Sequence, residues 1–140
     1  MMVFFVAACG GDPESPEQAV RRWLEAGEAA AEARDRGLLL EMVSASYNDP
    51  RGNERADIDK LLRLYFLRVQ DIALSVHVNE IVLHADTAAS VSITVGMLGV
   101  RGRLDSLTAN AYRFEFELQL EGGDWRLIAA RWAPIGDPLL

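Results

Sequence analysis

The hydrophobic and polar positions of this chain follow two different periods. Between residues 16 and 69, apolar residues recur every three or four positions, which is the spacing of helices that bury one face. Between residues 72 and 133 they alternate with polar residues, which is the period of strands that bury one face. The change of period predicts helices first and then an antiparallel sheet.

A strong helix start stands at the head of the first half. Ser15 can cap the helix, Pro16 suits its first position, and Gln18 completes a capping box. We expect this helix to stop at Gly37, because glycine readily adopts the conformation that follows a helix C-terminus.

Two further helices are expected before the sheet. A short one covers residues 38–43, and a longer one starts between residues 53 and 57 and ends near Val69. The segment between them, residues 44–52 (SASYNDPRG), is rich in turn-forming residues.

Four strands joined by turns predict an antiparallel meander. We place them at residues 72–83, 89–97, 112–121 and 125–133, with a loop over residues 99–106. Along the first strand the apolar positions change parity near Asn79-Glu80. A slip of one residue is what a β-bulge produces, and it predicts a bent strand.

Helices followed by a curved sheet form an α+β layout, with the helices packed on one sheet face. The order of elements resembles the NTF2-like superfamily, the cone-shaped fold that includes ketosteroid isomerase, scytalone dehydratase and SnoaL-type cyclases. The resemblance spans about residues 16–133 and rests on the helix with Trp23, residues 47–52, the helix over residues 58–67 and the hairpin at residues 123–127. It implies three N-terminal helices on a sheet of four to six antiparallel strands.

In that superfamily the helices leave a pocket at the mouth of the cone. The resemblance therefore implies a site for a small apolar ligand, although its lining residues could equally be plain core. The expected lining is Tyr65, Tyr112, Phe114, Phe116 and Trp132.

The outer face of the sheet should be polar. Its expected residues are Ser90, Ser92, Thr94, Arg113, Glu115, Glu117, Arg126 and Arg131. We interpret this face as solvated, and a wet homodimer interface, as in other members of the superfamily, is the alternative.

Asp49 and Tyr47 are the candidate catalytic residues. In the isomerases and dehydratases of the superfamily, acids and tyrosines near the pocket mouth handle protons, and a buried carboxylate with a raised pKa could act as a base. However, Asn48-Asp49-Pro50 is also an ordinary turn, and we favour that interpretation. We expect His77 and His84 on the surface, so neither is a strong candidate for acid–base chemistry.

The N-terminus suggests export. Residues 1–8 (MMVFFVAA) are apolar, and we interpret them as a truncated signal peptide. The sequence Val6-Ala7-Ala8-Cys9 resembles the lipobox of bacterial lipoproteins, which implies cleavage before Cys9 and acylation of that cysteine. Because Gly10 is not the aspartate that retains lipoproteins in the inner membrane, we expect an outer-membrane anchor facing the periplasm.

The expected organisation follows from these assignments. Residues 9–14 form a lipidated tether, residues 15–134 an NTF2-like domain, and residues 135–140 a C-terminal tail.

Composition narrows the function. The chain has 140 residues, 14 basic and 21 acidic side chains, and a net charge of −7, which excludes a protein that coats nucleic acid. One cysteine excludes an internal disulfide, and the absence of phosphate-binding, dinucleotide-binding and metal-binding motifs predicts no cofactor and no metal.

We therefore expect a lipid-anchored, non-enzymatic module that binds a small apolar ligand or a protein. The alternatives are an isomerase or dehydratase that uses Asp49 and Tyr47, and a structural partner in a cell-envelope assembly.

Overall fold

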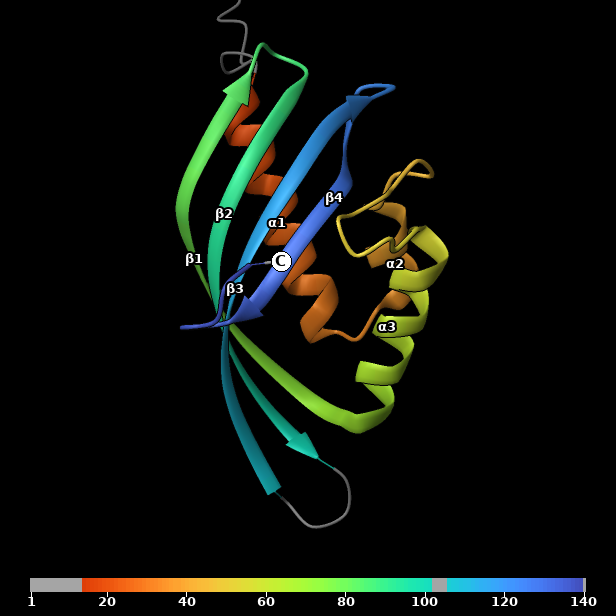
Figure 1. Cartoon of the computed structure of the whole chain (residues 1–140), viewed down its shortest axis with the longest axis vertical. Coiled ribbons are helices and arrows are strands. Elements are labelled where there is room, and N and C mark those ends of the chain that lie inside the picture. Colours follow the sequence, from red (N-terminus) through yellow and green to blue (C-terminus); the bar gives the residue numbers. More distant parts are fainter. Residues whose placement is uncertain (1–13, 102–105, 140) are drawn as a thin grey trace, which may run out of the picture.

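The computed structural model describes residues 14–101 and 106–139, and it has the expected α+β architecture (Figure 1). The helices are α1 (Pro16–Glu32), α2 (Arg36–Glu41) and α3 (Arg55–Arg68). The strands are β1 (Val69–His84), β2 (Ala88–Arg101), β3 (Ser106–Glu121) and β4 (Asp124–Pro134). The expected signal peptide, residues 1–8, and Cys9 lie outside the described residues.

The strands form one antiparallel sheet in the order β1-β2-β3-β4. The predicted bulge is confirmed, because the β1–β2 register shifts between Val78 and Glu80. The bounds predicted for the loop over residues 99–106 are too wide, since the β2–β3 ladder continues to the pair Arg101↔Ser106, and the rest of that loop, residues 102–105, lies outside the described residues. Backbone hydrogen bonds extend this hairpin although the alternation of apolar and polar residues has ended.

The start of α1 is as predicted, and its end is not. Gln18 donates its backbone N–H to Ser15 Oγ, and Ser15 donates its own to Gln18 Oε1, which completes the capping box. The helix ends at Glu32, whereas the predicted stop, Gly37, lies inside α2. Asp35 caps α2 by accepting a hydrogen bond from the backbone N–H of Leu38, so a new helix begins before Gly37.

The main core lies between α1 and the sheet. Val20 and Leu24 of α1 are buried against inward-facing strand residues. The buried strand positions in this cluster are Ala89, Val91, Ile93, Val95, Leu118, Trp125, Leu127 and Ala130. Figure 1 shows α1 lying across one face of the sheet, with α2 and α3 beside it.

The segment between α2 and α3 covers the outer edge of β4. Ser44 donates its backbone N–H to the Leu127 carbonyl at 2.9 Å, and Asn48 donates to the Ile128 carbonyl at 3.0 Å. This pairing satisfies part of an otherwise open strand edge, and it positions Tyr47 and Asp49 beside the sheet.

Among the described residues, no helix is both long and apolar enough to cross a membrane.

Candidate functional site

The two candidate catalytic residues lie in contact in the segment between α2 and α3. Tyr47 is 2 % exposed and Asp49 is 5 % exposed. The Tyr47 hydroxyl donates a hydrogen bond to Asp49 Oδ2 at 2.7 Å. Sequence reasoning therefore found two residues that the fold brings together.

Asp49 accepts three more hydrogen bonds from its own loop. Its Oδ1 accepts the backbone N–H groups of Arg51 at 2.9 Å and Asn53 at 3.0 Å, and its Oδ2 accepts the Asn53 side-chain amide at 3.1 Å. A carboxylate has about four acceptor sites, so those of Asp49 are all used. The carboxylate thus serves as the centre of a folded loop.

Arg51 ties this loop to the sheet. Its guanidinium donates to the Trp132 carbonyl at 2.8 Å and lies over the Trp132 ring, 4.7 Å from the ring centroid. Gly52, at φ +79°, closes the turn by donating its N–H to the Asp49 carbonyl at 2.9 Å. Glycine suits this position because it adopts positive φ without steric cost.

The environment holds the two side chains in opposite protonation states. Burial favours a higher pKa for Asp49, but the hydrogen bonds from Tyr47, Asn53 and Arg51 outweigh it, and the pKa lies below its usual value. The pKa of Tyr47 is raised above its usual range by burial and then by the hydrogen bond and charge of Asp49. A general base at neutral pH needs a pKa near 7, whereas the pKa of Asp49 is shifted downward, away from that value.

The five residues predicted to line a ligand pocket pack against the hydrophobic core or against one another. Phe114, Phe116 and Trp132 pack against the main core, and Trp23 of α1 meets Phe116 edge-on at 5.8 Å. Tyr65 packs with the smaller core cluster of Phe66, Val69 and Ile72. Tyr112 is half-buried beside Phe114.

Two pockets are described, and neither is lined by any of those five residues. The first has a volume of about 380 Å³ and lies between the start of α1 and the β3–β4 turn. Trp23, Trp125, Met42 and Leu120 provide its apolar lining. Its charged lining is Glu14, Arg22, Asp86 and Asp124, with Arg22 paired to Glu14 at 2.7 Å.

The second pocket has a volume of about 620 Å³ and lies between the α2–α3 segment and the start of α3. Tyr47 borders it and Asp49 does not. The Tyr47 hydroxyl is already directed at Asp49, so the pair does not present a carboxylate to this pocket.

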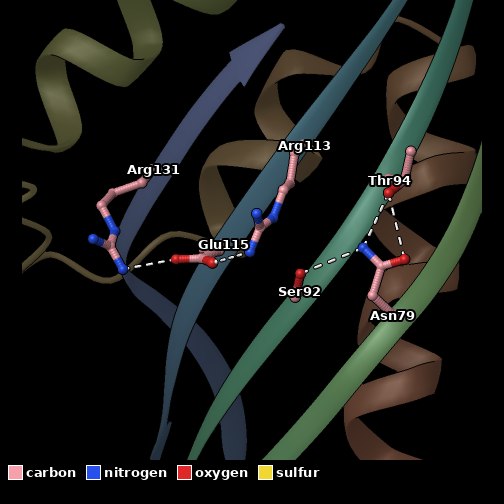
Figure 2. A network of polar contacts seen from close by, with 6 residues as sticks. All are labelled: Asn79, Ser92, Thr94, Arg113, Glu115 and Arg131. Carbon is pink, nitrogen blue, oxygen red and sulfur yellow. Dashed lines mark hydrogen bonds and ion pairs between the residues drawn. The ribbon is translucent and has the colours of Figure 1, made fainter. Parts of the chain in front are cut away.

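The outer face of the sheet carries two groups of polar contacts, one that joins β1 to β2 and one that joins β3 to β4 (Figure 2). Asn79 of β1 donates to Ser92 and Thr94 of β2 at 3.4 and 3.0 Å. On β3, Glu115 pairs with Arg113 at 2.8 Å and with Arg131 of β4 at 2.7 Å.

Arg126 and the two histidines are the remaining polar residues that the sequence analysis singled out. Arg126, expected on this outer face, reaches the sheet edge, where it donates to the Glu41 carbonyl and pairs with Asp124 at 3.8 Å. His77 and His84 are exposed, as expected.

Within the described part of the chain, no cluster of three or more histidine, cysteine or acidic side chains could hold a metal ion.

Neither a protein-family model nor a curated protein matches this chain in sequence. Solved structures do match. The Nuclear transport factor 2 (NTF2-like) superfamily protein from Salmonella enterica has a TM-score of 0.73 and 13% identity over 88% of this chain and 96% of its own. The chain has the NTF2-like fold.

Two further structures agree with this NTF2-like fold. A ketosteroid isomerase-like protein from Erwinia carotovora atroseptica has a TM-score of 0.72 and 14% identity, over 85% of this chain and 95% of its own. An uncharacterized protein with a cystatin-like fold from Caulobacter vibrioides has a TM-score of 0.70 and 14% identity, over 86% of this chain and 90% of its own. At such identities the likeness concerns the fold, and activity must be argued from the residues.

Proposed function

We propose that this NTF2-like chain is a non-enzymatic protein-interaction module, held by a lipid on Cys9 at the bacterial outer membrane and facing the periplasm. The outer sheet face is the observation that carries the interaction role. Polar side chains from all four strands are ordered on it (Figure 2). Within the described residues α1 lies on the opposite face of the sheet and α2 and α3 lie beside it, so no helix covers the outer face (Figure 1).

A second copy of the chain is the partner that this face fits best. The face presents both signs of charge, with Glu115 between Arg113 and Arg131. Two copies related by a twofold axis can place the arginines of one beside the glutamate of the other. Polar groups of this kind form wet interfaces in which water bridges many contacts.

The state of Asp49 supports a role without catalysis. Its four hydrogen bonds hold it ionised inside a loop, and its lowered pKa opposes the proton uptake that an isomerase base requires. Anchoring is supported by the likeness of Val6-Ala7-Ala8-Cys9 to a lipobox.

Sedimentation equilibrium of the Cys9→Ser chain tests the homodimer. We expect a dimer, and we expect Glu115→Arg to weaken it by at least about tenfold, because the substitution places three cations together on each copy. Glu25→Arg makes the same charge change on the exposed side of α1 and should leave the dimer intact. A monomer up to millimolar concentration would refute the interface.

The first pocket favours a second candidate function, the binding of a small ligand. Its apolar lining includes Trp23 and Trp125, and its acidic side chains outnumber Arg22. Indole faces and carboxylates together suit a ligand with an apolar body and a positively charged group.

Tryptophan fluorescence can test this second candidate with octylammonium and octanoate as probes of opposite charge. We expect octylammonium to bind more tightly, and we expect Asp124→Asn to weaken it while Asp137→Asn, an exposed carboxylate outside the pocket, does not. Equal response to both probes, or to both variants, would contradict a cation-selective pocket.

A further inference from the structure

The second half of α3 exposes an unusual face. Three leucines lie on it, with exposed fractions of 43 % for Leu61, 49 % for Leu64 and 74 % for Leu67. Large apolar side chains gathered on one helix face, rather than scattered singly over a surface, indicate a binding site.

Three cations share the face with these leucines. Lys60, Arg63 and Arg68 are exposed, and none of them is in an ion pair or side-chain hydrogen bond with another described residue. Residues 60–68 (KLLRLYFLR) contain no acidic residue, although the chain as a whole has a net charge of −7. Positive charge is therefore concentrated on the second half of α3, after the two acidic residues of its first half, Asp57 and Asp59.

Helical geometry interleaves the two kinds of side chain. At about 100° per residue, the three leucines and three cations fall alternately within an arc of roughly 160°. The opposite side of α3 packs inward through Ile58, Leu62, Tyr65 and Phe66. The exposed face is therefore not a by-product of an unpacked helix.

We propose that this face of α3 binds the surface of an anionic lipid membrane, with the helix axis parallel to the surface. The leucines enter the boundary between headgroups and acyl chains, and the cations extend their charged groups to the lipid phosphates. A packed protein partner fits less well, because it would desolvate three cations placed between the leucines, whereas headgroups keep them hydrated.

Binding through α3 does not require a lipid at Cys9, so the test uses a chain without that residue. Every described helix and strand begins after residue 14, so the chain is prepared from residue 10 onward without the apolar residues 1–8 and Cys9. It is sedimented with vesicles of phosphatidylglycerol and phosphatidylethanolamine, and separately with phosphatidylcholine vesicles. We expect at least about tenfold stronger partitioning onto the anionic vesicles, falling as salt rises.

Matched variants separate the face from general charge. Lys60→Gln/Arg63→Gln should weaken binding about thirtyfold, whereas Arg21→Gln/Arg22→Gln, the same charge change on α1, should have a much smaller effect. Leu61→Ser/Leu64→Ser/Leu67→Ser should also weaken binding, and circular dichroism checks that each variant is folded.

Three outcomes would overturn the proposal. They are equal partitioning onto both vesicle types, equal loss in the two double variants, and self-association of the chain that the leucine variant abolishes. The last of these would assign the face to a second copy of the chain. None of them concerns the outer sheet face, so the dimer proposal is tested separately.

Discussion

The Tyr47 hydroxyl donates its hydrogen to Asp49 Oδ2 at 2.7 Å, and both side chains are buried. Asp49 in turn accepts three hydrogen bonds from residues 51 and 53, and Arg51 ties the same loop to Trp132. The pair therefore lies where the segment between α2 and α3 joins the edge of the sheet. Its chemistry is that of a structural anchor, and this makes its contribution to stability measurable.

Loss of either partner should lower the free energy of unfolding. Tyr47→Phe removes one hydrogen bond to a charged group, which should cost about 1.5–3 kcal/mol. Asp49→Asn should cost more, about 3 kcal/mol or above, because an amide NH₂ would face the Asn53 amide or the backbone N–H donors that the carboxylate now satisfies. Urea denaturation measures both values.

Asp137→Asn provides the matched control for these measurements. It makes the same chemical change at an exposed carboxylate and should alter stability by less than about 0.5 kcal/mol. If Asp49→Asn proved as mild as this control, the loop would not depend on the carboxylate.

The lowered pKa of Asp49 predicts a loss of stability in acid. A carboxyl group with a lower pKa in the folded state stabilises the fold fully above its unfolded pKa, about 3.9, and loses that contribution as the pH falls through the folded value. The free energy of unfolding should therefore decline below about pH 4. The decline should be smaller in Asp49→Asn, which has no proton to take up, and a decline of equal size in both proteins would show that other carboxylates cause it.

Local signals in the sequence predicted the parts of the fold that depend on near neighbours. The Ser15–Gln18 capping box and the parity change near Asn79 involve residues close in the chain, and both are confirmed. The predicted end of the first helix at Gly37 is wrong because Asp35 caps a new helix that begins before Gly37. The β2–β3 hairpin also runs beyond the last alternating residues, since ladder hydrogen bonds need no apolar pattern.

The sequence predicted the residues of the candidate site, Tyr47 and Asp49, but not the contacts that surround them. Turn chemistry around Asp49 was visible in the sequence, but the contact between Arg51 and Trp132 joins residues 81 positions apart. The pocket that unites Trp23 with Trp125 has the same origin. Tertiary folding brings such residues together, and the hydrophobic periodicity of a single segment cannot predict contacts between distant segments.

The turn after α1 offers a separate prediction about backbone strain. Arg34 has φ +56°, a conformation that costs a residue with a Cβ about 1–2 kcal/mol. Its guanidinium compensates by donating to the carbonyls of Phe66 and of Gln70, the latter at 3.1 Å, which ties α1 to the junction of α3 and β1. Arg34→Ala loses the hydrogen bonds and retains the strain, whereas Arg34→Gly loses both.

We therefore expect Arg34→Ala to be the less stable of the two variants by about 1 kcal/mol in urea denaturation. Both variants lack the guanidinium, so their difference isolates the backbone. Equal stability of the two would mean that the positive φ carries no strain.

The acylation that we propose for Cys9 predicts where the chain is found in a bacterial cell. Stable anchoring requires more than one acyl chain, and a lipidated N-terminal cysteine supplies them. Cys9→Ser should therefore move the protein out of the membrane fraction, and a labelled fatty acid should be incorporated only by the chain with Cys9. As a control, Ser15→Ala, which removes a hydroxyl from the capping box of α1, should leave fractionation unchanged.

The proposed contact of α3 with lipid makes the wash conditions decisive in this experiment. Three cations and three leucines give reversible binding, so a protein held only by α3 is released by a high-salt wash, whereas an acylated protein stays. We expect the Cys9→Ser chain to be released and the unmodified chain to remain. Retention of the Cys9→Ser chain after that wash would refute the anchor, and release of both chains would show that Cys9 carries no lipid.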